Sequence, residues 1–273
     1  MTGRRHLLLL GGAAAVAGAA LACSEVSTNP NTVLSLQLVP MQLPSVVLGD
    51  SIHDTAGAVD SLHATAYNSK GLPVAGAPIR FLAISGRALV QVDSASGQVV
   101  GLATLDTVRD TLGNVVAIRT RALVIASVSG LQTLPDTIYV VERPDSLTPL
   151  DSATYSFDYN RGTLRDTTFP LRVQLWHLPA DTVPHYRLEY AFTHPLPNTN
   201  LDPAKPQLVN AAGVPQLVDT TTVAGGLSTL SLHLSFVADT MTDTVGVDVR
   251  AWEPDHTPVP GSPVHFTIHL HIH

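Results

Sequence analysis

The sequence predicts an all-β protein made of two antiparallel β-sandwich domains in tandem. The length of 273 residues allows two domains of ordinary size, each with its own core. Short apolar runs alternate with turn residues along the chain, and Thr, Ser, Val, Asp, Gly and Pro recur throughout. Outside the N-terminus, no long segment rich in Ala, Glu, Lys and Leu indicates a helix.

The composition is acidic, with a formal net charge of −7 at pH 7. Removal of an N-terminal leader that contains Arg4 and Arg5 takes this charge from −7 to −9. A negative surface repels phosphate backbones and anionic lipid headgroups. We therefore expect no nucleic-acid partner.

Residues 1–22 are predicted to be a lipoprotein signal peptide that is removed on export. A short basic segment with Arg4 and Arg5 precedes an apolar run from Leu7 to Ala22, which is the pattern of a secretory signal. The run is shorter than the roughly 20 residues that a membrane-spanning helix needs, so a permanent transmembrane anchor is the weaker alternative. The arginine pair also resembles a twin-arginine export signal, although its usual flanking residues are missing.

Cys23 follows this leader directly and is the only cysteine in the chain. A lone thiol in an oxidising compartment has no intramolecular disulfide partner. The sequence Ala20-Leu21-Ala22-Cys23 resembles the lipobox of bacterial lipoproteins, although Ala20 stands where Leu is more usual. The resemblance implies that Cys23 is the lipid attachment site, carrying diacylglycerol and palmitate, and that it anchors the protein to a membrane. Because Ala20 and Ala22 also suit an ordinary signal peptidase, a soluble secreted protein stays the alternative.

The residue after Cys23 is Ser24 rather than Asp. In the lipoprotein-sorting pattern that the lipobox resemblance brings with it, this residue implies transfer to the outer membrane. Residues 23–32 are polar and rich in turn formers, so we expect a flexible tether before the first folded strand.

Residues 33–142 are predicted to form the first β-sandwich, because seven strands in about 110 residues is the density of such a fold. The expected strands are residues 33–39, 61–67, 78–84, 88–93, 98–104, 123–128 and 136–141.

Two segments of this domain carry recognisable turn motifs. The segment HATAYNSKGLPVAGAPIRF (63–81) is similar to the pattern A-T-A-x-D-x-x-G-x-P-V-x-G-A-x-V-x-F, with Asn68 in place of Asp, and VQVDSASGQVVGLA (90–103) is similar to V-x-V-D-x-x-T-G-x-V. Both patterns are typical of bacterial immunoglobulin-like domains of the invasin and intimin type, which residues 33–142 resemble. The resemblance implies an immunoglobulin-like sandwich with a role in binding, adhesion or spacing. Convergence on the same architecture without shared ancestry is the alternative.

Residues 151–273 are predicted to form a second sandwich, with the boundary at 142–150, where two prolines occur and no apolar period is visible. Beyond the boundary, apolar residues alternate strictly, which indicates antiparallel sheets with one dry and one wet face. The clearest examples are residues 185–192, 228–236, 244–252 and 264–272.

The last strand carries four histidines on the face opposite its apolar residues, namely His265, His269, His271 and His273. Residues two apart in a strand are separated by about 6.6 Å, so His269 and His271 can converge on one ion. A hairpin with residues 244–252 is expected to place Asp248 beside His269. The alternative function is therefore a periplasmic metal-binding protein that holds zinc or copper through His269, His271 and Asp248. A structural zinc takes four ligands, so we expect this strand to bind metal only weakly.

The sequence lacks recognisable catalytic patterns such as a nucleophile elbow, a zincin motif or a phosphate-binding glycine loop. Ser228 sits at a strand start and is expected to serve a turn, while Trp176 and Trp252 have the parity of wet faces. We therefore predict a non-enzymatic lipoprotein of the outer membrane that binds an unidentified protein or surface ligand, or acts as a structural spacer. No cofactor is expected beyond the lipid on Cys23, and calcium at the domain junction is left open.

Overall fold

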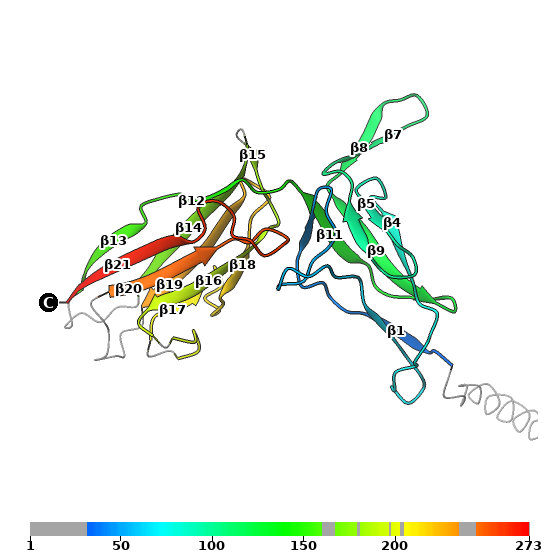
Figure 1. Cartoon of the computed structure of the whole chain (residues 1–273), viewed down its shortest axis with the longest axis horizontal. Helices are drawn as coiled ribbons and strands as arrows, with labels where there is room; N and C mark the ends of the chain where they lie inside the picture. Colours follow the sequence, from blue (N-terminus) through cyan, green and yellow to red (C-terminus); the bar gives the residue numbers. More distant parts are fainter. Residues whose placement is uncertain are drawn as a thin grey trace, which may run out of the picture.

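The computed structural model describes residues 32–159, 167–178, 181–196, 198–202, 205–234 and 244–272 (Figure 1). The predicted leader, Cys23, nearly all of the predicted tether and His273 lie outside the described residues. The described ranges consist of strands and turns, which confirms the all-β prediction. Within them, no helix has the length and apolar character to cross a membrane.

The first sandwich has strands on two sides of one apolar core. On one side, β9 pairs antiparallel with both β4 and β11. Strand β2 joins this sheet by pairing parallel to β11. The opposite side holds the β1–β3 pair and the β5–β6 hairpin. The bounds are β1 Ser35–Leu38, β2 Ser45–Val47, β3 Ala64–Tyr67, β4 Arg80–Ser85, β5 Val90–Val92, β6 Val99–Gly101, β9 Arg121–Val128, β10 Leu131–Gln132 and β11 Asp136–Val141. Buried side chains from both sides, such as Phe81, Val99 and Ile138, form the core.

The second sandwich consists of two five-stranded sheets. One sheet has the order β12-β14-β19-β17, with β15 paired to β14, and the other has the order β13-β21-β20-β16-β18. The bounds are β12 Ser146–Pro149, β13 Thr154–Tyr159, β14 Thr167–His177, β15 Asp181–Thr182, β16 Arg187–His194, β17 Gln207–Val209, β18 Val218–Thr220, β19 Leu227–Leu234, β20 Thr244–Arg250 and β21 Val264–Ile272.

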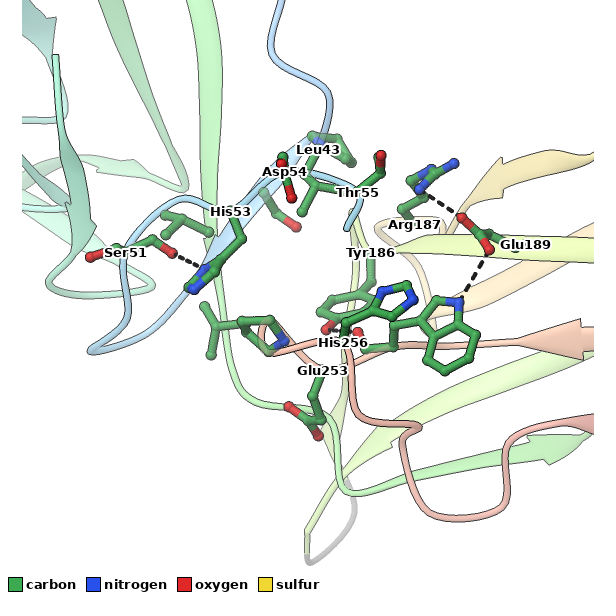
Figure 2. Close-up of a pocket in the computed structure, with 16 residues that line it drawn as sticks. Leu43, Ser51, His53, Asp54, Thr55, Tyr186, Arg187, Glu189, Glu253 and His256 are labelled. Carbon is green, nitrogen blue, oxygen red and sulfur yellow. Dashed lines mark hydrogen bonds and ion pairs between the residues drawn. The ribbon is translucent and has the colours of Figure 1, made fainter. Parts of the chain in front are cut away.

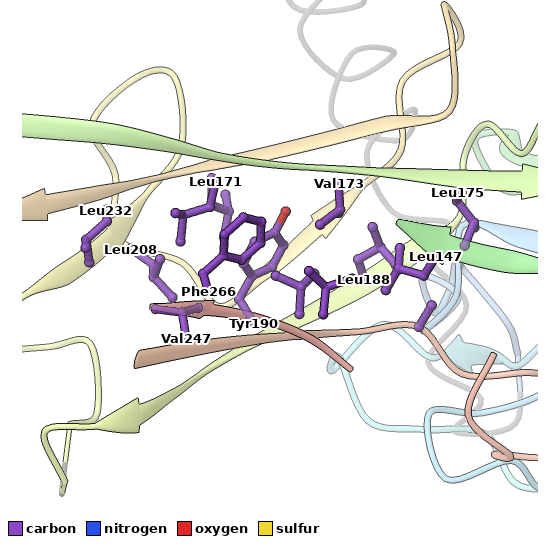
Figure 3. Packing of buried hydrophobic residues seen from close by; sticks show 14 of the residues in the cluster. Leu147, Leu171, Val173, Leu175, Leu188, Tyr190, Leu208, Leu232, Val247 and Phe266 are labelled. Atoms are coloured by element: carbon purple, nitrogen blue, oxygen red, sulfur yellow. The ribbon is translucent and has the colours of Figure 1, made fainter. Parts of the chain in front are cut away.

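The core of the second sandwich follows from the alternation in its strands. Leu230, Leu232 and Leu234 of β19 are fully buried and belong to one cluster with Leu188 and Tyr190 of β16 in the other sheet. Figure 3 shows Leu232, Leu188 and Tyr190 in this cluster. Strand β21 contributes Val264, Phe266, Ile268 and Leu270 to the same core. The predicted alternation of dry and wet faces is confirmed in these strands.

Both sandwiches divide their first strand between the two sheets. In the first, β1 pairs with β3 while β2 runs parallel to the last strand, β11. In the second, β12 pairs with β14 while β13 runs parallel to the last strand, β21. The second sandwich contains the strand order of an immunoglobulin domain, with strands A, B, E and D in one sheet and G, F and C in the other, and β18 is an additional edge strand beside C. The structure thus shows tandem immunoglobulin-like sandwiches, and the two parallel pairs are an addition to the antiparallel sheets predicted.

The second sandwich begins earlier than the sequence indicated. Within the predicted boundary segment 142–150, β12 forms and pairs antiparallel with β14. Leu147 in this strand is only 2% exposed, and its backbone N–H donates to the carbonyl of Pro260 over 2.9 Å. The connection between the sandwiches is therefore the short segment 142–145. One apolar residue between two prolines produces no visible period, so the sequence could not indicate this strand.

A hairpin that the sequence did not predict projects from the first sandwich (Figure 1). Its strands are β7, Asp106–Arg109, and β8, Val115–Arg119, which pair only with each other among the described residues. All five residues of β8 are exposed, and Leu112 near the tip is 84% exposed. A two-stranded ribbon without a core behind it is marginally stable.

Thermolysin is expected to cleave the hairpin at residues 106–119 before it cleaves segment 142–150. The hairpin offers exposed apolar residues on a weakly supported backbone, whereas Leu147 is buried and hydrogen-bonded. Mass spectrometry of a digestion time course identifies the order of the two cuts. A first cut inside 142–150 would show that β12 is not stably packed and that the boundary predicted from the sequence is the better description.

Candidate functional site at the domain junction

The C-terminal histidines take the face that the sequence predicted for them. Residues Val264, Phe266, Ile268 and Leu270 of β21 are buried, while His265, His269 and His271 are exposed. The side-chain parity of this strand is therefore confirmed for the described residues.

The predicted partner of these histidines was wrong. Strand β20 pairs with β21 so that Asp248 lies opposite His265, and Thr244 lies opposite His269. The hairpin turns at residues 253–257, where the Glu253 N–H donates to the Thr257 carbonyl, whereas pairing of Asp248 with His269 would need a turn centred on Pro258 and Val259. A shift in loop length changes every cross-strand pair, which is why the sequence alone placed Asp248 beside the wrong histidine.

Asp248 has partners of its own in this register. Its side chain is 7% exposed, with Oδ1 2.7 Å from His265 Nδ1 and Oδ2 3.1 Å from the guanidinium of Arg250. Over the described ranges, no group of three or more His, Cys, Asp or Glu side chains is placed to hold a metal ion. The register thus does not place Asp248 beside His269 and His271, as the sequence had predicted.

A different cluster joins the two sandwiches at segment 142–145. The Arg143 guanidinium donates through Nη2 to Asp50 Oδ2 of the first sandwich and through Nη1 to Glu253 Oε2 of the second, both over 3.0 Å. The arginine side chain is about half exposed (53%), so water screens these ion pairs. Each contributes on the order of 0–1 kcal/mol, which orients the domains more than it holds them together.

Apolar packing at the same junction is the stronger restraint. Val47 of β2 and Val141 of β11 belong to the first sandwich by pairing, yet their side chains pack in the buried cluster of the second. The His185 ring stacks on Tyr139, with centroids 3.5 Å apart. The two sandwiches therefore pack directly on each other at these contacts.

A close backbone approach completes the junction. Gly57 has a φ of +84°, and a Cβ at this position would lie 2.6 Å from the Cβ of His256. Only glycine permits both the positive φ and this contact.

A cleft lies between the sandwiches at this point (Figure 2). Its cavity volume is about 50 Å³, room for a few waters or for the end of one side chain. The first sandwich contributes Leu43, Pro44, Ser45, Val46, Val47, Ser51, His53, Asp54 and Thr55, and the second contributes Tyr186, Arg187, Glu189, Trp252, Glu253, Pro254 and His256. Figure 2 shows Leu43, Asp54 and Thr55 on one side and Tyr186 and His256 on another.

Hydrogen bonds fix the aromatic wall of the cleft. The Tyr186 hydroxyl donates to the Trp252 carbonyl over 2.6 Å, and the Trp252 indole N–H donates to Glu189 Oε2 over 3.1 Å. His256 stacks on the indole, with ring centroids 4.4 Å apart. Burial raises the pKa of Tyr186 well above its usual value, so this hydroxyl stays a neutral donor. The wall is therefore formed before any ligand arrives.

The cleft is net negative. Asp54, Glu189 and Glu253 face it together with one cation, Arg187, whose guanidinium is 2.8 Å from Glu189 Oε1. Burial raises the pKa of Glu253, and the nearby Arg143 opposes that shift. Asp54 Oδ1 accepts the backbone N–H groups of Ala56 and Ala58, both over 2.9 Å.

The wet parity of Trp252 is the one sign of this site in the sequence. Trp176 has the same parity but hydrogen-bonds Thr148 instead and does not line the cleft. The other lining residues come from loops of both domains, and no local pattern shows that they converge.

Ser228, expected from the sequence to serve a turn, lies inside β19 and is fully buried. Its hydroxyl donates to Asp219 Oδ2 over 2.6 Å and lies 2.8 Å from the Tyr190 hydroxyl. The Ser228 hydroxyl has no solvent access, and its two partners lie on strands of the opposite sheet. It therefore links the two sheets, and a substrate cannot reach it.

The chain matches no protein-family model, and no curated protein matches it. Among solved structures it is similar to the fibronectin(III)-like modules of Clostridium thermocellum CbhA, at 11% identity over 87% of this chain and 95% of that one, with a TM-score of 0.28. The D00-D0 domain of intimin matches at 12% identity over 85% of this chain and 99% of that one, with a TM-score of 0.26. Drosophila N-cadherin EC1-3 matches at 14% identity over 89% of this chain and 69% of that one, with a TM-score of 0.27. At these scores the likenesses carry no argument about function, and the assignment of the fold rests on the strand pairing.

Proposed function

We propose that this chain is a non-catalytic lipoprotein of the cell envelope whose two immunoglobulin-like sandwiches act as one rigid binding or spacing unit. The observation that carries the proposal is the junction, where Val47 and Val141 of the first sandwich enter the core of the second. Burying apolar side chains across a domain interface removes the free hinge that a flexible tether would give.

The arrangement of the sandwiches suits a spacer. They follow one another end to end with a bend at the junction, and β1 and the C-terminal end of β21 lie at opposite ends of the molecule (Figure 1). A chain anchored near its start would hold its C-terminal domain away from the membrane, with the cleft at the bend between the two units.

The anchor in this proposal is a lipid on Cys23 at the outer membrane. Cells fed labelled palmitate are expected to incorporate label into the wild-type protein and to retain it in the outer-membrane fraction, because the thioether-linked lipid partitions into the bilayer. Cys23→Ser removes the only thiol and should abolish both the label and the retention. Wild-type protein that takes up no palmitate and fractionates as a soluble species would contradict the anchor and favour secretion.

A further inference from the structure

We propose that the cleft at the domain junction binds the cationic side chain of a partner protein, a lysine or an arginine. This inference deepens the binding role proposed above and rests on it. Three features of the cleft support it: its apolar and aromatic wall, its unsatisfied carboxylate oxygens and its size.

The wall suits the long apolar stem of such a side chain. Leu43 and Pro44 from one domain and Tyr186 and Trp252 from the other line the cleft. Lysine and arginine bury their methylene groups along apolar surface while the charged head seeks a polar partner.

Two carboxylates offer acceptors for the charged head. Asp54 uses only Oδ1 for its loop, and Glu253 uses only Oε2 for Arg143, so Asp54 Oδ2 and Glu253 Oε1 have no partner among the described residues. Glu189 differs, because both of its oxygens are occupied by Arg187 and Trp252. Both residues line the cleft, Asp54 from the first sandwich and Glu253 from the second.

The charge of the chain and the size of the cleft also favour a cationic side chain as the occupant. The chain as a whole is acidic, with a formal charge of −7, so it attracts basic partners at long range. A cavity of about 50 Å³ takes the end of one side chain and is too small for a nucleotide. A single inserted cationic side chain meets both conditions.

The test is an NMR titration of the full chain carrying Cys23→Ser with N-acetyl-lysine methylamide and N-acetyl-arginine methylamide. The chain has two tryptophans, so the indole N–H signal of Trp252 reports on the cleft and that of Trp176 is an internal control. We expect a saturable shift of the Trp252 signal alone, with a Kd in the millimolar range. N-acetyl-norleucine methylamide, which keeps the apolar stem and lacks the charge, should bind at least fivefold more weakly.

Two variants test which residues contribute to binding of the lysine probe. Asp54→Asn is expected to weaken lysine binding at least fivefold, whereas Trp176→Leu should leave it unchanged. Equal binding of the norleucine and lysine probes would overturn the cationic assignment. The absence of any shift at Trp252 with either cationic probe would overturn the inference altogether. Neither of these results alters palmitate incorporation at Cys23, so failure of this inference is distinguishable from failure of the proposed lipoprotein function.

Discussion

Leu147→Ala is expected to lower the free energy of unfolding of the second sandwich by about 2–5 kcal/mol. Leu147 is 2% exposed, lies opposite Leu175 in the β12–β14 pair and packs in the main apolar cluster (Figure 3). Replacing it with alanine removes buried methyl groups and leaves a cavity that the rigid sheets cannot close. Denaturant unfolding followed by fluorescence measures the change.

Leu150→Ala is the matched control for this variant. Leu150 follows the same strand but is 45% exposed, so its truncation should change the free energy of unfolding by less than about 1 kcal/mol. If Leu147→Ala were as mild as the control, segment 142–150 would be the linker that the sequence suggested, and β12 would not be part of the sandwich.

Gly57→Val is expected to separate the two sandwiches at the junction. A Cβ on Gly57 would lie 2.6 Å from the Cβ and 2.9 Å from the backbone nitrogen of His256, which is closer than real Cβ contacts allow. The obstruction is backbone and Cβ rather than the flexible end of a side chain, so relief requires the domains to move apart. Spin labels on Ser69→Cys and Ala212→Cys, in the Cys23→Ser background, should show a longer and broader distance distribution by pulsed EPR.

Because Gly57 has a positive φ, Gly57→Val also strains the backbone, and a control variant must reproduce this strain. Gly71 has a φ of +72°, and a Cβ added there would meet no atom within 4 Å. Gly71→Val therefore carries the same backbone cost of roughly 1–2 kcal/mol without the obstruction. This control should lower stability and leave the distance between the labels unchanged. Equal distance distributions in the two variants would mean that Gly57 and His256 are not in contact in solution.

Most strands could be predicted from the sequence, because their alternation of buried and exposed residues is visible within the strand itself. In β16, β19 and β21, apolar residues recur at alternate positions, and Leu188, Leu230 and Phe266 are examples that the structure buries against the opposite sheet. The turn after β3, where Asn68 Oδ1 accepts the N–H groups of Lys70 and Leu72, is likewise indicated by a short motif.

Features that depend on distant segments were not predictable. Strands β2 and β12 are short, and each is held by pairing with a partner far along the chain. The pairing of Asp248 with His265 depends on the length of a turn, and the cleft depends on loops from two domains. Local patterns contain no information on such long-range register, so the candidate site became visible only with the structure.

The rigidity of the junction underlies both the proposed spacer role and the proposed cleft. Residual dipolar couplings of backbone amides in weakly aligned full-length protein carrying Cys23→Ser measure this rigidity, because they report the mean orientation of each domain. If the two sandwiches form one rigid unit, a single alignment tensor fits the amides of both, in the orientation set by Arg143, Val47 and Val141. Two tensors of clearly different magnitude would show independent domain motion and would contradict the rigid unit.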